Sequence, residues 1–266
     1  MTPTERCFLA LTWCITGVVV VFLLTPLVVT VVVSFSSSSI FTLPPPDWSL
    51  QWYRRLAGYQ GLLPALLLSL QVAAVSTTAS LVLGTLCAIG ISRGNFAGRE
   101  IVMAFMVSPL MMPQLVIGVA LLQYFRALGM GDPYGSLLIT HVIITMPFVV
   151  RTVSAALVLF DFDMVDAART LGYSYFRAHL KITVPVLAPA FLTASLFAFL
   201  ASMDNYPISI FFTDAWTKTL PIQMLQYIEE TPDPTVAAIS SLLILLTAIA
   251  LIVADRLVGL RRLGDL

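Results

Sequence analysis

Two stretches of this 266-residue chain hold polar side chains whose type and spacing could do chemistry. The first, residues 202–207, places the carboxylate of Asp204 inside a long apolar segment. An ionisable group at membrane depth is costly and by default marks a functional position. Pro207 cannot donate a backbone hydrogen bond, so a carbonyl one turn earlier is left free. Because a carboxylate beside free carbonyls favours a cation, Asp204, Asn205 and Tyr206 are the candidate residues of a solute path.

Other readings of Asp204 stay open from the sequence alone. This acid lies 19 residues after Pro185, which corresponds to about 28 Å of continuous helix at 1.5 Å per residue. At that position it could line a path or its outer gate, pair with a neighbouring helix, or lie at the outer membrane interface.

The second stretch, residues 159–185, is a polar connection between two apolar segments. Asp163 suits a helix N-cap, and Asp166 then falls in the first turn, where an acid is favourable. Two alanines follow and favour helix. Gly172 suits the residue just past a helix end, where φ is often positive.

A second short helix is predicted over residues 175–182, capped by Ser174. Pro185 is expected to begin the next membrane span, where its missing N–H costs nothing. Together these signals predict a helix–turn–helix knob at the membrane surface. Capping signals are common, so a merely well-capped loop is the alternative.

The remaining candidates are weaker. His141 stands in an apolar segment and could relay protons, but no paired carboxylate accompanies it, so a structural role is favoured. His179 is expected on the polar surface of the connection. The run Met111-Met112-Pro113 is expected to kink a helix rather than bind a metal, since a soft metal wants Cys or His nearby. The cysteines lack metal-ligand spacing and are expected to be packing thiols: Cys7, Cys14 and Cys87.

Composition places these stretches in a membrane protein. The chain is 59% hydrophobic and only 11% charged, with a mean hydropathy of +0.95, whereas a soluble domain keeps about a quarter of its residues charged. The formal net charge is +0, and no basic stripe with interleaved aromatics is present, so nucleic acid is not an expected partner. Most of the surface is therefore expected to face lipid.

A helix needs about 20 mainly apolar residues to cross a bilayer, and six segments qualify: 10–33, 63–91, 101–125, 135–158, 186–211 and 236–258. The first is too long for a signal-peptide core and is expected to be retained. Trp48, Trp52 and Tyr53 are expected to anchor the following loop at the interface. We predict an all-α integral membrane protein with six transmembrane helices in a single domain, residues 1–266.

Basic residues in the loops orient the chain. With a cytoplasmic N-terminus, ten of the 14 Lys and Arg residues lie inside and four outside. Both termini and the 159–185 connection are therefore predicted to be cytoplasmic, and the acidic 212–235 loop external.

The second stretch resembles the "EAA" signature of ABC importer permeases. It reads Asp166-Ala167-Ala168, three residues, Gly172, nine residues, Ile182-x-Val184-Pro185. The family pattern has Glu in place of the first Asp and Leu in place of the Val, at the same spacings. The resemblance covers about residues 60 to 260 and implies a type I importer permease fold. It also implies that Asp166, Ala167, Ala168, Gly172 and Pro185 belong to a coupling helix that docks in a groove of a separate ATPase.

The resemblance implies a set of partners as well. These are a homologous permease subunit forming a heterodimer, two ATP-binding subunits and an extracytoplasmic solute-binding protein, assembled in a bacterial inner membrane. This chain contains no G-x-x-x-x-G-K-[ST] loop to cradle phosphates. It is therefore not expected to be an enzyme or to hold a cofactor, and ATP and Mg²⁺ would bind the partner ATPase.

Residues 202–206, Thr219-Leu220-Pro221 and 233–238 resemble the second permease subunit of the spermidine/putrescine branch. This implies a polyamine solute, although Asn205 stands where that branch often has a second acid. Another amino compound, such as an amino acid, is the alternative. A stand-alone secondary transporter would need paired intramembrane ions, and a membrane enzyme would need His or carboxylate clusters, so both are less favoured.

Overall fold

The computed structural model describes residues 3–214 and 216–258, and every regular element in those ranges is helical. The longer helices are α1 (Pro3–Ser34), α3 (Leu62–Arg93), α5 (Gln114–Ala127), α6 (Pro133–Leu157), α10 (Ala188–Met203), α11 (Leu220–Glu230) and α12 (Thr235–Val258). The shorter ones are α2 (Gln51–Ala57), α4 (Arg99–Val107), η1 (Ser108–Met111), α7 (Asp163–Thr170), α8 (Tyr175–Ala178), η2 (His179–Thr183), α9 (Val184–Val186) and η3 (Ser209–Phe212). The all-α prediction is confirmed.

The described chain divides into two compact units, with the boundary inside α11. One unit comprises α1, α2, most of α11 and α12, and the other comprises residues 61–223. In the first unit the Nε1–H of Trp52 donates to the carbonyl of Ser36 at 2.6 Å. The hydroxyl of Tyr53 lies 2.7 Å from that of Ser34. The expected aromatic anchor is therefore wrong for Trp52, which is buried, while Trp48 is exposed.

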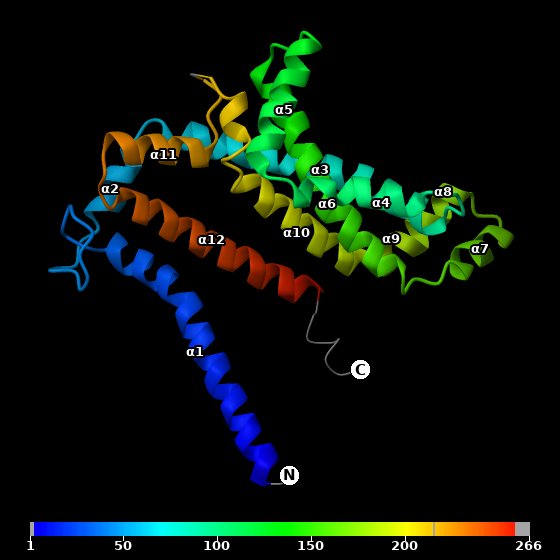
Figure 1. The fold of residues 1–266 in the computed structure, drawn as a ribbon, viewed down its shortest axis with the longest axis horizontal. Coiled ribbons are helices and arrows are strands. Elements are labelled where there is room, and N and C mark those ends of the chain that lie inside the picture. Colours follow the sequence, from blue (N-terminus) through cyan, green and yellow to red (C-terminus); the bar gives the residue numbers. More distant parts are fainter. Residues whose placement is uncertain (1–2, 215, 259–266) are drawn as a thin grey trace. The chain divides into compact units, whose positions relative to one another are not determined.

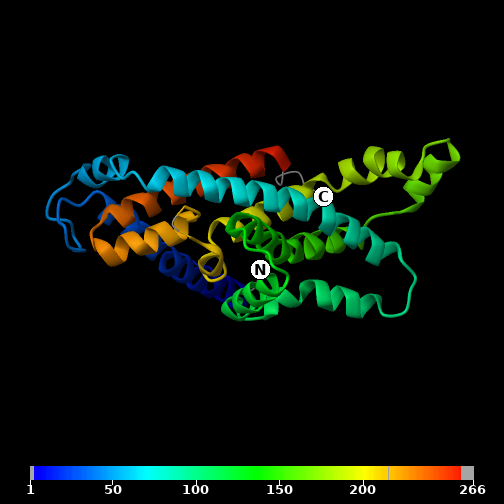
Figure 2. The same ribbon diagram turned by 90° about the horizontal axis from the view of Figure 1, so that it is seen from above.

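The core of the second unit is a three-helix bundle of α3, α6 and α10, which lie side by side in both views (Figures 1 and 2). Small side chains allow the close approach, as they do in other membrane helix packing. A Cβ added at Gly84 of α3 would lie 2.9 Å from Cγ1 of Val149 on α6. Nearby, the hydroxyls of Ser80 and Thr145 are 2.7 Å apart. The bundle thus combines tight apolar contacts with hydrogen bonds between helices.

Among the described residues, four helices are long and apolar enough to span a membrane, and the count reaches six if each of two bent pairs is one span. The spans predicted over 101–125 and 186–211 are the two that are bent. The first is broken after Met111 and bends by 108° into α5. The second bends by 76° between Val186 and Ala188 and then ends at Met203. Pro113 explains the first break, as expected, because proline cannot continue the hydrogen-bond ladder.

Candidate functional site

The connection after α6 forms a helix–turn–helix knob, as predicted; we use "the knob" for residues 163–186 (α7, α8, η2 and α9). Gly172 follows the end of α7 with φ of +94°. The N–H of Gly172 donates to the carbonyl of Arg169, and that of Tyr173 to Ala168, which is a Schellman closure. Ser174 accepts the N–H of Arg177 at 3.4 Å and so caps α8.

The N-cap of α7 lies one residue earlier than predicted. Asp163 is the first helical residue rather than the N-cap, which is Phe162. Asp161 accepts the N–H of Asp163 at 2.9 Å. An acid two residues earlier therefore satisfies a donor at the helix start, as an Asx-type turn does.

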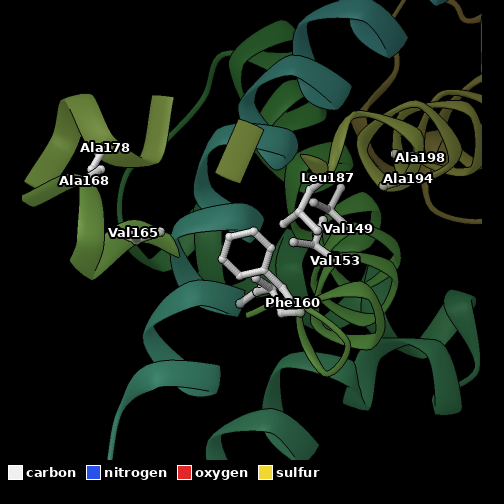
Figure 3. Close-up of a cluster of buried hydrophobic side chains, with 11 residues drawn as sticks. Val149, Val153, Phe160, Val165, Ala168, Ala178, Leu187, Ala194 and Ala198 are labelled. Atoms are coloured by element: carbon white, nitrogen blue, oxygen red, sulfur yellow. The ribbon is translucent and has the colours of Figure 1, made fainter. Parts of the chain in front are cut away.

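Ala168 lies inside the knob and not on its surface. Its residue is 9% exposed, and its methyl group faces that of Ala178 between α7 and α8 (Figure 3). Val165 is buried in the same cluster. Small side chains here let α7 and α8 pack closely. Ala167 and Gly172 are exposed, so of the small residues in the resemblance only these two present a face to a partner.

The carboxylate of Asp166 is held by Arg93, the last residue of α3. Nη2 of Arg93 lies 2.5 Å from Oδ2 of Asp166, and the guanidinium sits 5.3 Å from the ring centre of Phe162 and 5.7 Å from that of Tyr175. The Arg93 hydrogen bond holds the pKa of Asp166 below its ordinary value. Asp166 therefore ties the knob to α3, a contact that its sequence position did not reveal.

The second half of the knob is a continuous helical rod with a π-helical turn. The turn covers His179–Thr183, and Pro185 lies two residues beyond it. Because Pro185 has no N–H and its ring crowds the carbonyl four residues earlier, a wider turn relieves the ladder there. Pro185 thus lies just before the bend of 76° that leads into α10. His179 is buried with Nδ1 2.8 Å from the hydroxyl of Thr183, so its expected surface position is wrong.

The candidate solute-path residues lie where α10 ends. At 16 residues, α10 is about 24 Å long, which is shorter than the hydrocarbon core of about 30 Å. Asp204 caps this end and is exposed, and its carboxylate has no hydrogen-bond or ion-pair partner among the described residues. Tyr206 is half-buried. An acid whose charge no other side chain satisfies is suited to a cationic group of a solute.

The side chain of Asn205 is buried and hydrogen-bonded at the turn after α10, so it does not face the candidate solute path. Its residue is 4% exposed. The side-chain oxygen accepts the N–H of Ile208 at 3.2 Å, and Nδ2 donates to Oε1 of Gln114 at 3.1 Å. Gln114 is exposed and begins α5, directly after the break in the third apolar segment. The break before α5 therefore meets the turn that follows α10, and Gln114 is a site residue that sequence reasoning missed.

Behind Asp204 and Gln114 lies a buried set of hydrogen-bonded polar residues, which we call the polar junction: Ser76, His141, Ser202, Asn205 and Ser209. It joins α3, α6, α10 and the turn after Asp204. Irregular backbone at membrane depth is tolerated only where protein buries it or where it lines a water-filled cavity. The polar junction covers the buried side of the turn after α10, and Asp204 and Gln114 lie on its exposed side.

Comparisons with known proteins agree with this geometry. The model of the family described as "Binding-protein-dependent transport system inner membrane component" matches residues 80–262. The chain belongs to this family. It is 32% identical over 238 residues to the spermidine/putrescine transport system permease protein PotC of Escherichia coli (strain K12), covering 90% of this chain and 89% of that protein.

One further relative and one solved structure extend this comparison. The putrescine transport system permease protein PotI of the same strain is 31% identical over 230 residues, covering 84% of this chain and 82% of that protein. The fold is that of the crystal structure of a bacterial ABC transporter involved in the import of the acidic polysaccharide alginate. That match has a TM-score of 0.69 at 16% identity and covers 97% of this chain and 98% of that chain.

The chain is thus a multi-pass permease component of an ABC importer, and it is homologous to polyamine permeases. Its relatives are transport subunits and not enzymes. Their family works with a partner permease, an ATPase and a binding protein. The sites with which this permease would meet its solute and its ATPase follow from the geometry of the breaks and of the knob.

Proposed function

We propose that this permease imports a small cationic or amino-bearing solute, with a polyamine such as putrescine or spermidine favoured. The solute is handed over by an extracytoplasmic binding protein in a bacterial inner membrane. The permease pairs with a different, homologous permease subunit, and two separate ATP-binding subunits hydrolyse ATP-Mg. The observation that carries the proposal is Asp204, an exposed carboxylate without a described partner at the point where two broken helices meet.

The geometry supports a cation at this position. In a low-dielectric site an ammonium group beside one carboxylate gains far more than it would in water. The exposed amide of Gln114 adds a polar contact for an amine. The similarity to PotC and PotI, whose names state spermidine and putrescine transport, supports the same solute class.

One carboxylate is present where two would suit a diamine, because the side chain of Asn205 is engaged by Gln114 and by the N–H of Ile208. The second candidate is therefore the same machinery carrying an amino acid or another compound with a single amine. A zwitterion would place its amine on Asp204 and its carboxylate elsewhere.

We further propose that the knob is the docking surface for the ATPase. Its exposed face carries large apolar side chains, with Leu171 81% and Phe176 70% exposed, next to Ala167 and Gly172. Arg93 would pass movement of the docked knob to α3. The docking step is a rigid-body push, since the Schellman closure and the Arg93 contact leave the knob little freedom to deform.

Uptake into proteoliposomes tests the solute. The complex captured through this permease should contain an ATPase and a second permease, and it should take up radiolabelled putrescine when the binding protein and ATP are supplied. Asp204→Asn should raise the KM for putrescine while leaving assembly intact. Glu100→Gln, which changes an exposed acid on α4, is the matched control and should not.

Three outcomes would overturn the proposal. One is an unchanged putrescine KM and rate for Asp204→Asn. Another is uptake of neutral solutes in preference to amines. The third is transport driven by an ion gradient in the absence of any ATPase.

A separate pair of variants tests the docking surface. Leu171→Asp should abolish co-purification of the ATPase, whereas Leu159→Asp should not, because Leu159 is 91% exposed but precedes the knob. Equal retention of the ATPase by both variants would remove the knob from the interface.

A further inference from the structure

His141 is buried between two serine hydroxyls that flank Asp204 in the sequence. Its residue is 1% exposed. Nδ1 lies 2.7 Å from Oγ of Ser202, two residues before Asp204, and Nε2 lies 3.0 Å from Oγ of Ser209, five residues after it. A side chain on α6 thus holds both sides of the turn that carries the solute-path acid.

The hydrogen atoms in this cluster can be assigned by counting donors. Ser209 has one hydroxyl hydrogen, and it goes to the carbonyl of Asn205 at 2.5 Å. Ser209 must therefore accept from His141, which places the proton on Nε2. No carboxylate contacts the ring among the described residues, so a charged imidazolium would lack a counter-ion.

The neutral ring then accepts at Nδ1, so the hydroxyl of Ser202 donates to it. Ser76 shares its hydrogen between Ser202 and the carbonyl of Ala73, each 3.3 Å away. All the hydrogen bonds therefore run in one direction, from Ser76 through Ser202, His141 and Ser209 to a backbone carbonyl. A backbone carbonyl cannot pass a proton onward. This series of hydrogen bonds therefore fixes a conformation and is not a proton relay.

We infer that His141 is a positioning residue, which in its Nε2–H form fixes the turn between Ser202 and Ser209 so that the carboxylate of Asp204 points into the solute path. This rests on the proposed function of Asp204. Removing the ring leaves the hydroxyl hydrogen of Ser202 without an acceptor, takes one donor away from Ser209 and frees the turn, so the acid meets the solute in the right orientation less often.

Substitutions of His141 can separate its two contacts. A Gln amide reaches the position of Nε2 and can donate to Ser209, whereas an Asn amide reaches only the position of Nδ1 and Ser202. Ser154→Ala is the matched control, because Ser154 is also on α6 and its buried hydroxyl has no described partner. Putrescine uptake by the full complex gives KM and kcat, and thermal unfolding checks folding.

We expect His141→Ala to raise the putrescine KM about tenfold, the factor that corresponds to one unsatisfied buried hydrogen bond. His141→Gln should restore most of the affinity and His141→Asn should not, while Ser154→Ala should match wild type. In an Asp204→Asn background, His141→Ala should have no further effect on KM, because the turn no longer positions an acid. If the Ala variant does not assemble, the Gln and Asn variants decide.

The inference alone is overturned if Asp204→Asn raises KM while His141→Ala leaves it unchanged, or if the Gln and Asn variants behave alike. It is also overturned if the effects of His141→Ala and Asp204→Asn are additive. An unchanged KM for Asp204→Asn overturns the proposed function, and the inference with it.

Discussion

Gly172 is the position at which a single methyl group gives the sharpest test of the knob. Its φ of +94° lies in the region that residues with a Cβ disfavour. A Cβ built at Gly172 meets no heavy atom within 4 Å. Substitution by alanine therefore causes no clash, and its cost is confined to the backbone.

That cost is about 1–2 kcal/mol for an alanine in the left-handed region, which shifts the local opening equilibrium about 5- to 30-fold. Asparagine tolerates this conformation better and should cost less. Proline is the extreme case, because its φ is fixed near −65° and it removes the N–H that donates to Arg169. The expected loss of knob stability is largest for Pro, smaller for Ala and smallest for Asn.

Amide hydrogen exchange of the assembled complex measures the opening of residues 163–178, and solute-stimulated ATP hydrolysis measures coupling. Gly172→Ala should speed exchange in this segment by about 5- to 30-fold and weaken coupling, and Gly172→Pro should abolish transport with insertion intact. Gly98→Ala is the matched control, since Gly98 has a φ of +91° and open space but lies outside the knob. It should leave coupling unchanged.

Full coupled transport by Gly172→Pro would refute the reasoning, because that variant cannot form the closure. Equal loss of coupling in Gly172→Ala and Gly98→Ala would also refute it, since the effect would then reflect general strain and not the knob.

The other predictions concern α3. Arg93→Ala should loosen the knob and uncouple ATP hydrolysis from transport, and the swap Arg93→Asp with Asp166→Arg should recover part of the coupling; no recovery would argue against the ion pair. Because the pKa of Asp166 is lowered by Arg93, the pair contributes stability above about pH 4. That stability is lost as the pH falls through the lowered pKa, so the protection factor of the knob, which corrects exchange for its intrinsic rate at each pH, should be constant from pH 5 to 8 and fall only in acid. Gly84→Ala should lower the thermal unfolding temperature at a cost of about 1–3 kcal/mol, because the added Cβ would lie 2.9 Å from Val149. Gly90→Ala on the same helix meets nothing within 4 Å and should be neutral or slightly stabilising.

Local chemistry made several features predictable. Apolar length indicated a helical membrane protein, because crossing a bilayer requires about 20 such residues whatever the fold. The turn at Gly172 and the cap at Ser174 were also predictable, since both depend on atoms within a few residues. The direction of the chain across the membrane and the role of the knob in docking stay predictions.

Contacts between distant residues could not be read in the same way. Arg93 and Asp166 are 73 residues apart, and Gln114 and Asn205 are 91 apart. No spacing rule connects such positions, because each pair is brought together only when α3, α6 and α10 pack. For the same reason Asn205, which sequence reasoning placed on a functional surface, turned out to be packed inside. Ala168 is also packed inside, because α7 folds back against α8.

The sequence by itself thus determined the class of protein, the short helices of the knob and the presence of an acid within a long apolar segment. Each of these follows from local composition, hydrogen-bond caps or backbone preference. Only the tertiary structure decided that the start of α5 meets the turn after α10 at Gln114 and Asn205, that Arg93 holds Asp166, and that His141 contacts both sides of the turn of Asp204. Those arrangements depend on which helix faces meet, and a linear order of residues does not specify that.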